Sequence, residues 1–426
     1  MLTRIEIDGF KSFDRFGLDL PPFLVVLGQN ASGKSNLFDA IRLLGRLGNS
    51  STLVEAFAET RGSLTEQFRA KGGREITTSM RFAAEMLLDS AVTDQFGEQV
   101  AVEHDQVRYE LDLELRLDRV RDSIAIYVAR EVAYPIGRPD APFLETVGTG
   151  DSREFVLSSE NGGKGRRSPA NAARATVLST IRLAAEFPVL FAIRNELEFW
   201  RFLQLDPSAL RLSGATGQSD AYLEPGGGNL AMVLRRIGLE TRDEYGSGLD
   251  DIVVDLGAVV RGISDVGVDE TATGRWEIRL VTRDGPISAR VASDGTLRVL
   301  ALLAALHDPQ HRGLMCFEEP ENGIFPQRLR ELLHVLRNMV MASVSDGPRL
   351  QVILSSHSPL MLFELDPAEV VVMDTVTQVG PEERKASTVS RVRALTESET
   401  LERVSDHEQR ALPGIGRDEA LRLLEA

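Results

Sequence analysis

A glycine-rich segment near the start of the chain carries residue types that hold phosphate groups. The segment reads Gly28-Gln29-Asn30-Ala31-Ser32-Gly33-Lys34-Ser35. Glycines let the backbone curl so that several N–H groups point at phosphate oxygens, and a lysine adds positive charge. In this pattern Lys34 reaches the β- and γ-phosphates of a nucleotide, and the Ser35 hydroxyl binds Mg²⁺. We therefore predict a nucleotide site formed by these eight residues.

Two carboxylates follow an apolar segment in the last third of the chain. Residues 314–317 read Leu-Met-Cys-Phe and lead directly into Glu318 and Glu319. A buried strand that ends in two acids places them at the carboxyl edge of a sheet, where open α/β sheets bind ligands. One acid can hold Mg²⁺ or its water, and the next can orient or deprotonate an attacking water.

Two further motifs carry polar groups at the expected ends of elements. Ser293 and Gly295 stand at the start of an expected helix, where a hydroxyl and backbone N–H groups can bind an anion. The same residues are also an ordinary helix cap, so both interpretations stay open. His357 follows an apolar strand within the sequence Ser-Ser-His-Ser-Pro. A single histidine is usually structural, but this position at a strand end favours a contact with a bound γ-phosphate.

The elements around these motifs indicate an α/β core. Residues 23–27 are continuously apolar, as in a strand buried on both faces, and helical spacing of apolar residues follows the glycine-rich segment. Strand, loop and helix is the context that a phosphate-binding loop requires. Helices are expected at residues 229–237, 249–260, 295–307 and 327–341. Buried strands are expected at residues 313–317, 350–354 and 370–373.

The other patterns predict antiparallel strands and one more helix. Residues 2–8 alternate apolar and polar side chains, which predicts an edge-type strand. Period-2 patterning predicts strands at residues 76–83, 107–117 and 124–132. The Arg-Asp-Gly sequence at residues 283–285 is typical of a hairpin turn. Residues 172–187 favour an amphipathic helix that ends at Pro188.

Composition describes an ordinary globular chain. Of its 426 residues, 42% are hydrophobic and 26% are charged, which excludes global disorder. The apolar runs are far shorter than the roughly 20 residues that cross a bilayer, and the start has no apolar signal-peptide core. We therefore expect no membrane span and a cytoplasmic location. The net charge of −16 argues against a nucleic-acid footprint over the whole surface, though not against a local basic groove. The single cysteine, Cys316, excludes an internal disulfide.

Taken in order, these motifs resemble those of the ABC-type ATPases of the RecF/SMC/OLD group. The similar motifs are a Walker A loop at residues 28–35, a signature motif at 293–298, a Walker B strand at 314–319, a D-loop at 321–326 and a switch histidine at His357. The opening phrase at residues 5–13 is also similar. The resemblance is close over residues 1–48 and 290–375 and only general between them.

The resemblance implies a fold class and a division of the chain. The fold is α/β, with an ABC-type P-loop NTPase core that carries an antiparallel β lobe and a helical insertion. Its core is a mixed sheet with flanking helices. Residues 1–150 would form an N-terminal ATPase lobe, 151–289 a mainly helical insertion, and 290–426 a C-terminal ATPase lobe. The two lobes together would be one discontinuous ATPase domain.

The resemblance also implies ATP and Mg²⁺ as cofactors and ATP hydrolysis as the activity. Lys34 and Ser35 would bind phosphate and magnesium, Glu318 would hold the metal, and Glu319 would be the general base. His357 would meet the γ-phosphate.

Partners follow from the same resemblance. Ser293 and Gly295 would touch the γ-phosphate held by the opposite subunit, which implies a homodimer with composite ATP sites. DNA is a further expected partner. A separate effector or nuclease protein is also expected, because the roughly fifty residues after Val372 leave no room for a nuclease domain. The output would be a DNA-repair or phage-defence process.

Several departures and alternatives stay open. Glu318 stands where the group usually carries aspartate, which leaves room for a nucleotide-gated scaffold with little turnover. Phe325 stands where related sequences often carry histidine. An ABC transporter subunit is disfavoured because the chain lacks a Leu-Ser-Gly-Gly-Gln signature. The basic sequence Lys164-Gly165-Arg166-Arg167 could contact DNA phosphates, although a solvated loop is the plainer interpretation.

Overall fold

The computed structural model describes residues 1–71, 75–118, 122–158, 165–215, 217–242, 247–346, 349–378, 386–396 and 412–425. The chain divides into two compact units. The first comprises Met1–Pro21, Leu27–Trp200 and Pro367–Ala426, and the second comprises Pro22–Val26 and Arg201–Asp366. The backbone therefore passes from one unit to the other at four points along the sequence. The functional division into residues 1–150, 151–289 and 290–426 stays a prediction.

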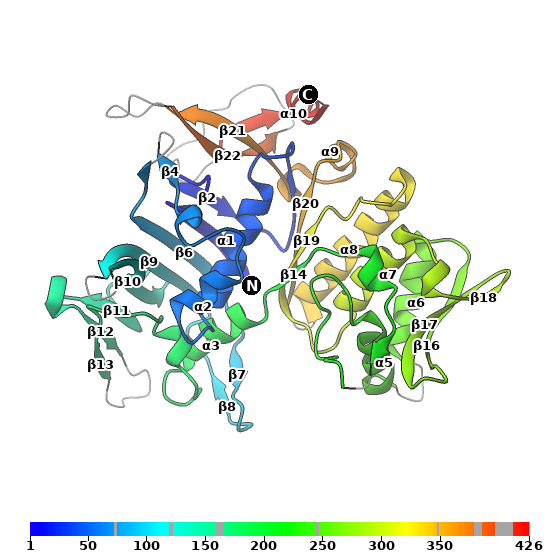
Figure 1. Ribbon diagram of the computed structural model, residues 1–426, viewed down its shortest axis with the longest axis horizontal. Coiled ribbons are helices and arrows are strands. Elements are labelled where there is room, and N and C mark those ends of the chain that lie inside the picture. The colour runs from blue at the N-terminus through cyan, green and yellow to red at the C-terminus, as the bar shows by residue number, and fades with distance from the viewer. Residues whose placement is uncertain are drawn as a thin grey trace. The chain divides into compact units, whose positions relative to one another are not determined.

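An eight-stranded antiparallel sheet is the broadest element of the first unit (Figure 1). Its strands follow the order β13-β12-β11-β10-β9-β6-β1-β2. They are β1 (Leu2–Asp8), β2 (Phe16–Asp19), β6 (Ser79–Leu87), β9 (Gln106–Asp118), β10 (Ser123–Pro135), β11 (Leu144–Val147), β12 (Glu154–Leu157) and β13 (Arg166–Pro169). In β9, Val107, Tyr109, Leu111 and Leu113 are buried, and the residues between them are polar. This period of two gives the sheet one apolar and one charged face.

Strand β1 is an interior strand, so the edge-type strand predicted for residues 2–8 is wrong. Its neighbours are β6 on one side and β2 on the other. The chain turns back after β1 through Gly9, whose φ of +72° suits glycine, and the short strand β2 then covers the outer side of β1. Alternating polarity reports that one face of a sheet is apolar and the other polar. It does not report where the strand stands in the order.

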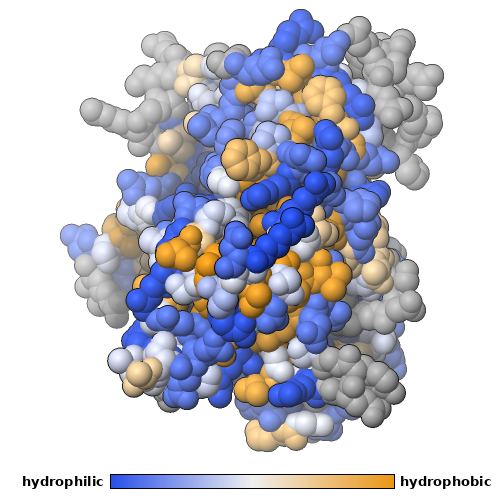
Figure 2. All heavy atoms as spheres, turned by 90° about the vertical axis from the view of Figure 1, so that its right-hand side faces the viewer, coloured by the Kyte–Doolittle hydropathy of each residue, from blue (hydrophilic) through white to orange (hydrophobic). Residues whose placement is uncertain are grey.

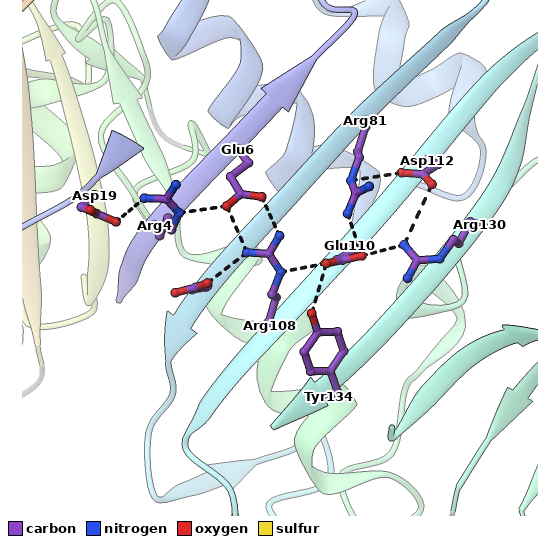
Figure 3. Close-up of polar contacts among 10 residues, drawn as sticks. Arg4, Glu6, Asp19, Arg81, Arg108, Glu110, Asp112, Arg130 and Tyr134 are labelled. Atoms are coloured by element: carbon purple, nitrogen blue, oxygen red, sulfur yellow. Dashed lines mark hydrogen bonds and ion pairs between the residues drawn. The ribbon is translucent and has the colours of Figure 1, made fainter. Parts of the chain in front are cut away.

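The charged face of this sheet holds a ladder of ion pairs centred on Arg108 (Figure 3). Its guanidinium lies 2.6 Å from Glu6 Oε2, 2.9 Å from Glu85 Oε1 and 2.8 Å from Glu110 Oε1. Burial alone would raise the pKa of Glu110. Hydrogen bonds from Arg108 and Arg130 outweigh that effect and lower the pKa to about 2. The pKa of Glu6 is likewise lowered to about 2, because the arginine bonds outweigh its burial.

Replacement of Arg108 by methionine is expected to cost about 3 kcal/mol of unfolding free energy, because three acids, two of them buried, lose their shared cation. It should also change the acid profile. A carboxylate with a lowered folded pKa stabilises the fold above its unfolded pKa, and that stabilisation disappears as the pH falls through the folded pKa of about 2. The wild type should therefore lose stability between about pH 5 and pH 2 more steeply than the variant. Urea unfolding at several pH values measures both effects, and parallel profiles would contradict the network.

The first unit also contains helices and three C-terminal strands. The helices are α1 (Lys34–Leu47), α2 (Leu53–Ala58), α3 (Pro188–Glu198) and α10 (Arg417–Glu425). Strands β21 (Val370–Gln378), β22 (Ser387–Thr396) and β23 (Gly414–Gly416) lie in that order, with α10 against β22 and β23 (Figure 1). Two short pairs complete the strands, β4 (Ala70–Lys71) with β5 (Glu75–Ile76) and β7 (Ala91–Thr93) with β8 (Gln99–Ala101). Helix α1 contacts both α2 and α3.

The helix predicted at residues 172–187 is wrong. That stretch holds only a single 3₁₀ turn at Leu178–Thr180, and α3 begins at Pro188, the residue predicted to end a helix. Buried Glu131 explains the difference, because its carboxylate accepts the backbone N–H groups of Val177 at 2.6 Å and Leu178 at 3.2 Å. Proline suits the first position of α3, where no N–H donor is needed.

The second unit combines a parallel sheet, an antiparallel sheet and helices. Strands β14 (Arg201–Leu203), β19 (Gly313–Glu318) and β20 (Leu350–Ser356) run parallel in that order, and β3 (Phe23–Leu27) lies next to β20. The antiparallel sheet follows the order β15 (Gly214–Ala215), β17 (Arg275–Thr282) and β16 (Ile263–Glu270), and β18 (Gly285–Ser288) pairs with β17. The helices are α4 (Pro207–Leu210), α5 (Leu230–Glu240), α6 (Gly248–Val259), α7 (Asp294–Leu306), α8 (Pro326–Asp346) and α9 (Met361–Glu364). Helix α6 contacts α7, α8 and β16, and α8 contacts β20.

Most predicted elements of this unit are present within a few residues. Helices α5, α6, α7 and α8 correspond to the four helical ranges, and β17 with β18 forms the predicted hairpin.

Apolar side chains gather near the middle of the face shown in Figure 2, and hydrophilic side chains lie between them. In the described part of the chain, no helix is both long and apolar enough to cross a membrane.

Candidate functional site

The glycine-rich segment forms a tight loop between β3 and α1, and it belongs to the first unit from Leu27 onward. Gly33 has φ of +105°, and a Cβ atom at this position would overlap the Ser390 hydroxyl. A Cβ on Gly28 would lie 2.5 Å from the Met373 carbonyl oxygen and 2.6 Å from Ser32 Oγ. Both positions therefore require glycine, because neighbouring backbone and side chains approach too closely for any other residue.

The loop places the Lys34 ammonium group and the Ser32 hydroxyl at the start of α1. Lys34 is buried, and its Nζ donates to the carbonyl oxygens of Gly28 at 2.6 Å and Gln29 at 2.8 Å. Ser32 is also buried, and its hydroxyl has no hydrogen-bond partner among the described residues. No side chain caps the first turn of α1. An ammonium group, a buried hydroxyl and an uncapped helix start fit a phosphate group.

Residues outside the predicted site support this loop. Asn36 donates to Ser12 Oγ at 2.9 Å, and the Ser390 hydroxyl donates to the same oxygen at 2.8 Å. Arg61 Nη2 lies 3.3 Å from the carbonyl oxygen of Ser35. Ser12 lies in the opening phrase at residues 5–13, and the similarity of that phrase was the sequence signal that could have identified it. Ser390 carried none, because its role depends on where β22 lies in the fold.

The acids predicted as Walker B lie at the end of β19 in the second unit. Glu318 is the last residue of the strand, and Glu319 follows it with a positive φ of +50°. The Glu319 N–H donates to the Ser355 carbonyl at 2.9 Å, so the turn stays tied to β20. Asn322 donates from Nδ2 to Glu319 Oε2 at 2.7 Å. A non-glycine residue in this backbone region costs about 1–3 kcal/mol and typically marks a functional turn.

The structure brings His357 next to these acids, as the sequence predicted for the sheet edge. His357 Nδ1 lies 3.8 Å from Glu319 Oε1 and 3.2 Å from Glu321 Oε1. Sequence reasoning missed Glu321 and Asn322 as site residues. Their position in the D-loop was visible, but their contacts depend on the approach of β20.

Ser293 and Gly295 begin helix α7 in the same unit. The Ser293 hydroxyl accepts the Thr296 N–H at 3.2 Å, which is the ordinary cap contact. A Cβ on Gly295 would overlap the carbonyl oxygen of Gly323 in the D-loop. The signature turn and the D-loop are therefore in direct backbone contact, and the predicted phosphate contact of Ser293 and Gly295 stays a prediction.

Replacement of Gly295 by alanine is expected to lower the urea midpoint, at a cost of about 1–3 kcal/mol, because the new methyl must displace the Gly323 carbonyl. Gly257→Ala in α6 is the matched control. Only the Ile263 carbonyl lies near that position, at 3.6 Å, so alanine should be neutral or stabilise the helix by up to about 1 kcal/mol. Equal midpoints for the two variants would show that the D-loop moves freely away from α7.

The predicted site residues fall into two groups. Gly28 to Ser35 lie in the first unit, whereas Glu318, Glu319, His357, Ser293 and Gly295 lie in the second. The predicted metal ligands Ser35 and Glu318 belong to different groups. Among the described residues, no three His, Cys, Asp or Glu side chains form a metal-binding cluster. Magnesium beside a nucleotide needs only one or two protein ligands, because phosphates and waters supply the rest.

The predicted basic loop is partly outside the described residues, which exclude Lys164. Arg166 and Arg167 lie in β13. Arg166 donates to Thr180 Oγ1 at 3.2 Å, and Arg167 pairs with Glu154 at 3.1 Å. Both arginines thus have partners within the protein.

Comparisons with known proteins agree with the fold and the motifs. A family model described as "AAA domain, putative AbiEii toxin, Type IV TA system" matches residues 23–123 and 256–362, just under half of the chain. A crystal structure of an Smc head bound to the C-winged helix domain of ScpA is 13% identical, with a TM-score of 0.50. That match covers 91% of this chain and 98% of the other.

Two further matches are with the same kind of protein. An Smc head domain with an extended coiled coil, bound to the C-terminal domain of ScpA from Pyrococcus furiosus, is 13% identical with a TM-score of 0.49. It covers 92% of this chain and 96% of the other. The chromosome partition protein Smc of Methanocaldococcus jannaschii is 51% identical over 41 residues, which are 9% of this chain. The chain thus matches only 4% of the length of that curated relative.

The fold and the motifs define a P-loop NTPase with the α/β fold of an Smc head. The family match over just under half of the chain and the ordered motifs agree with those of the ABC-type P-loop ATPases of the RecF/SMC group. This class supports nucleotide binding and hydrolysis as its general chemistry.

Proposed function

We propose that the protein binds and hydrolyses ATP with Mg²⁺, and that it dimerises on ATP to drive or gate a DNA-repair or phage-defence process. The observation that carries this proposal is the phosphate loop. Its backbone turns, buried Lys34 and uncapped helix start fit a nucleotide's phosphates. Ser35 and Glu318 would hold Mg²⁺, which would offset the phosphate charge.

Glu319 supplies the base in this proposal. Asn322 holds Glu319 Oε2 at 2.7 Å, so the side chain is oriented before any substrate binds. A fixed carboxylate can accept a proton from an attacking water without first rearranging. His357, beside Glu319, meets the terminal phosphate. Lys34 stabilises the charge that builds on the phosphate oxygens.

The dimer is supported by the surface around the signature turn. Val291 and Phe325 are 71% and 72% exposed, and they lie close in sequence to Ser293 and to the D-loop residue Gly323, which contacts Gly295. Large apolar side chains left in solvent beside a polar site are typical of a surface that another protein covers. We propose that a second copy of the chain covers this surface and presents its phosphate loop to Ser293 and Gly295.

The output of the cycle is proposed from the comparisons. The words "putative AbiEii toxin, Type IV TA system" in the description of the matching family support a defence process. The Smc head structure is bound to ScpA, which supports a separate protein partner here, and the name of the chromosome partition protein Smc supports a DNA transaction. An effector or nuclease encoded as another protein would carry out the final step.

A complementation experiment tests the composite site. Lys34→Ala and Ser293→Arg should each be inactive alone, the first through lost phosphate binding and the second because a bulky side chain blocks docking. In a mixed dimer, one site carries both lesions and the other carries neither. We expect ATPase activity to return when the variants are mixed, to about a quarter of the wild-type rate per chain if half of the dimers are mixed and one intact site works alone.

The control is a cross-linking test for mixed dimers, with each variant carrying a different tag. Mixed dimers without any recovered activity would contradict independent composite sites. Full activity of Ser293→Arg alone would contradict the assignment of Ser293.

A further inference from the structure

Glu321 contacts both Ser356 and His357 in the turn that ends β20. Its Oε1 accepts a hydrogen bond from the Ser356 hydroxyl at 2.6 Å and from the His357 backbone N–H at 3.0 Å. The same oxygen lies 3.2 Å from the ring nitrogen His357 Nδ1. One carboxylate oxygen therefore binds the end of β20 and the histidine backbone, and it also lies beside the ring.

The two partners differ in exposure. The side chain of Glu321 is 9% exposed, whereas that of His357 is 48% exposed. Glu321 Oε2 is buried and has no hydrogen-bond partner among the described residues. Burial of an unpartnered carboxylate oxygen costs free energy. A residue that only holds the turn would avoid this cost with a neutral acceptor. The negative charge of Glu321 therefore indicates an interaction with the His357 ring.

The ring nitrogen that faces the acids is Nδ1. Besides Glu321 Oε1 at 3.2 Å, Glu319 Oε1 lies 3.8 Å from it. An ionised carboxylate oxygen only accepts hydrogen bonds, so Glu321 at 3.2 Å favours a proton on Nδ1, and the negative charge of Glu319 at 3.8 Å acts in the same direction. The other nitrogen, Nε2, is then the one that can gain or give a proton.

We infer that Glu321 is a positioning residue for His357, which holds the proton on Nδ1 and leaves Nε2 as the nitrogen that meets the terminal phosphate. A proton taken up at Nε2 makes the ring a donor to phosphate, and Glu321 balances the resulting charge. The role toward phosphate rests on the proposed function. The placement of the ring proton does not.

Ring ¹⁵N NMR of histidine-labelled protein at pH 8.5, without nucleotide, tests the proton's position. His357→Gln identifies the signal by its loss. We expect the neutral ring of His357 to carry its proton on Nδ1 in the wild type. We expect it on Nε2, the usual form of neutral imidazole in water, in Glu321→Ala. Glu331→Ala, which removes an exposed acid of α8, is the matched control and should leave the Nδ1–H form unchanged.

A wild-type ring protonated on Nε2 would overturn the inference, and this result does not depend on any variant folding. Retention of the Nδ1–H form in folded Glu321→Ala would overturn it as well. Circular dichroism of each variant supplies the check on folding.

Turnover gives a second readout. Glu321→Ala should lower kcat about 10-fold or more with little change in the Kd for ATP, because it acts on the ring and not on phosphate binding. If Glu321 acts through His357, the double variant Glu321→Ala/His357→Ala should be no slower than His357→Ala alone. Independent, multiplied losses would contradict the inference. A wild type without turnover would instead contradict the proposed function, and the NMR result would still decide the position of the ring proton.

Discussion

Replacement of Lys34 by alanine is expected to weaken ATP binding at least about 100-fold, which corresponds to about 3 kcal/mol. The buried ammonium lies over the phosphate loop, held by the carbonyl oxygens of Gly28 and Gln29. A nucleotide phosphate would meet this charge inside a partly desolvated loop, where one charge contributes more than it does in water. Isothermal titration with Mg-ATP measures the loss.

The matched control for this variant is Lys71→Ala. Lys71 is an exposed lysine of β4 in the same unit, so its removal changes the net charge equally and leaves the loop intact. Its affinity for ATP should stay within about twofold of the wild-type value. Near-normal ATP affinity in folded Lys34→Ala would refute the phosphate site.

Glu319→Gln is expected to bind ATP normally and to lose turnover by at least about 100-fold. A glutamine oxygen can keep the hydrogen bond from Asn322 Nδ2, so the geometry of the turn should survive. The amide cannot accept a proton from water, and the ATP-bound state should therefore accumulate. Phosphate release measures turnover, and light scattering with saturating Mg-ATP should show the dimer.

This variant also separates enzyme from scaffold. If the wild type were a nucleotide-gated scaffold with little turnover, phosphate release would be equally low before and after the substitution. Glu331→Ala serves again as a control for the loss of one acid in this unit. A monomer at saturating Mg-ATP would count against the dimer model.

The chemistry-bearing motifs were predictable because each one is local. Gly28, Gly33 and Lys34 occupy fixed positions in one short loop, and Glu318 and Glu319 directly follow one apolar strand. The residue types indicate the backbone conformations that these positions need, such as the φ of +105° at Gly33. The period-2 strands of the large sheet were predictable for the same reason.

The rest depended on contacts between distant segments. Glu321 is one of three acids in the sequence Glu-Glu-Pro-Glu, and only the approach of Ser356 and His357 gives it a special role. Residues 172–187 have apolar side chains at helical spacing, but the buried Glu131 carboxylate accepts hydrogen bonds from two backbone N–H groups of this segment. The position of β1 in its sheet likewise depends on β2 and β6, which no pattern within residues 2–8 reports.

The four passages of the backbone between the two units govern how the chain can fold on the ribosome. The Ser390 hydroxyl behind the phosphate loop meets Ser12 across 378 positions of sequence, and Arg69 meets Ser387 across 318. Synthesis must therefore reach the segment that starts at Pro367 before the first unit can close. Contacts of such long sequence separation slow folding and leave strand edges open meanwhile. A nascent chain released before β22 would hold the whole eight-stranded sheet and still lack the residues that support its nucleotide loop.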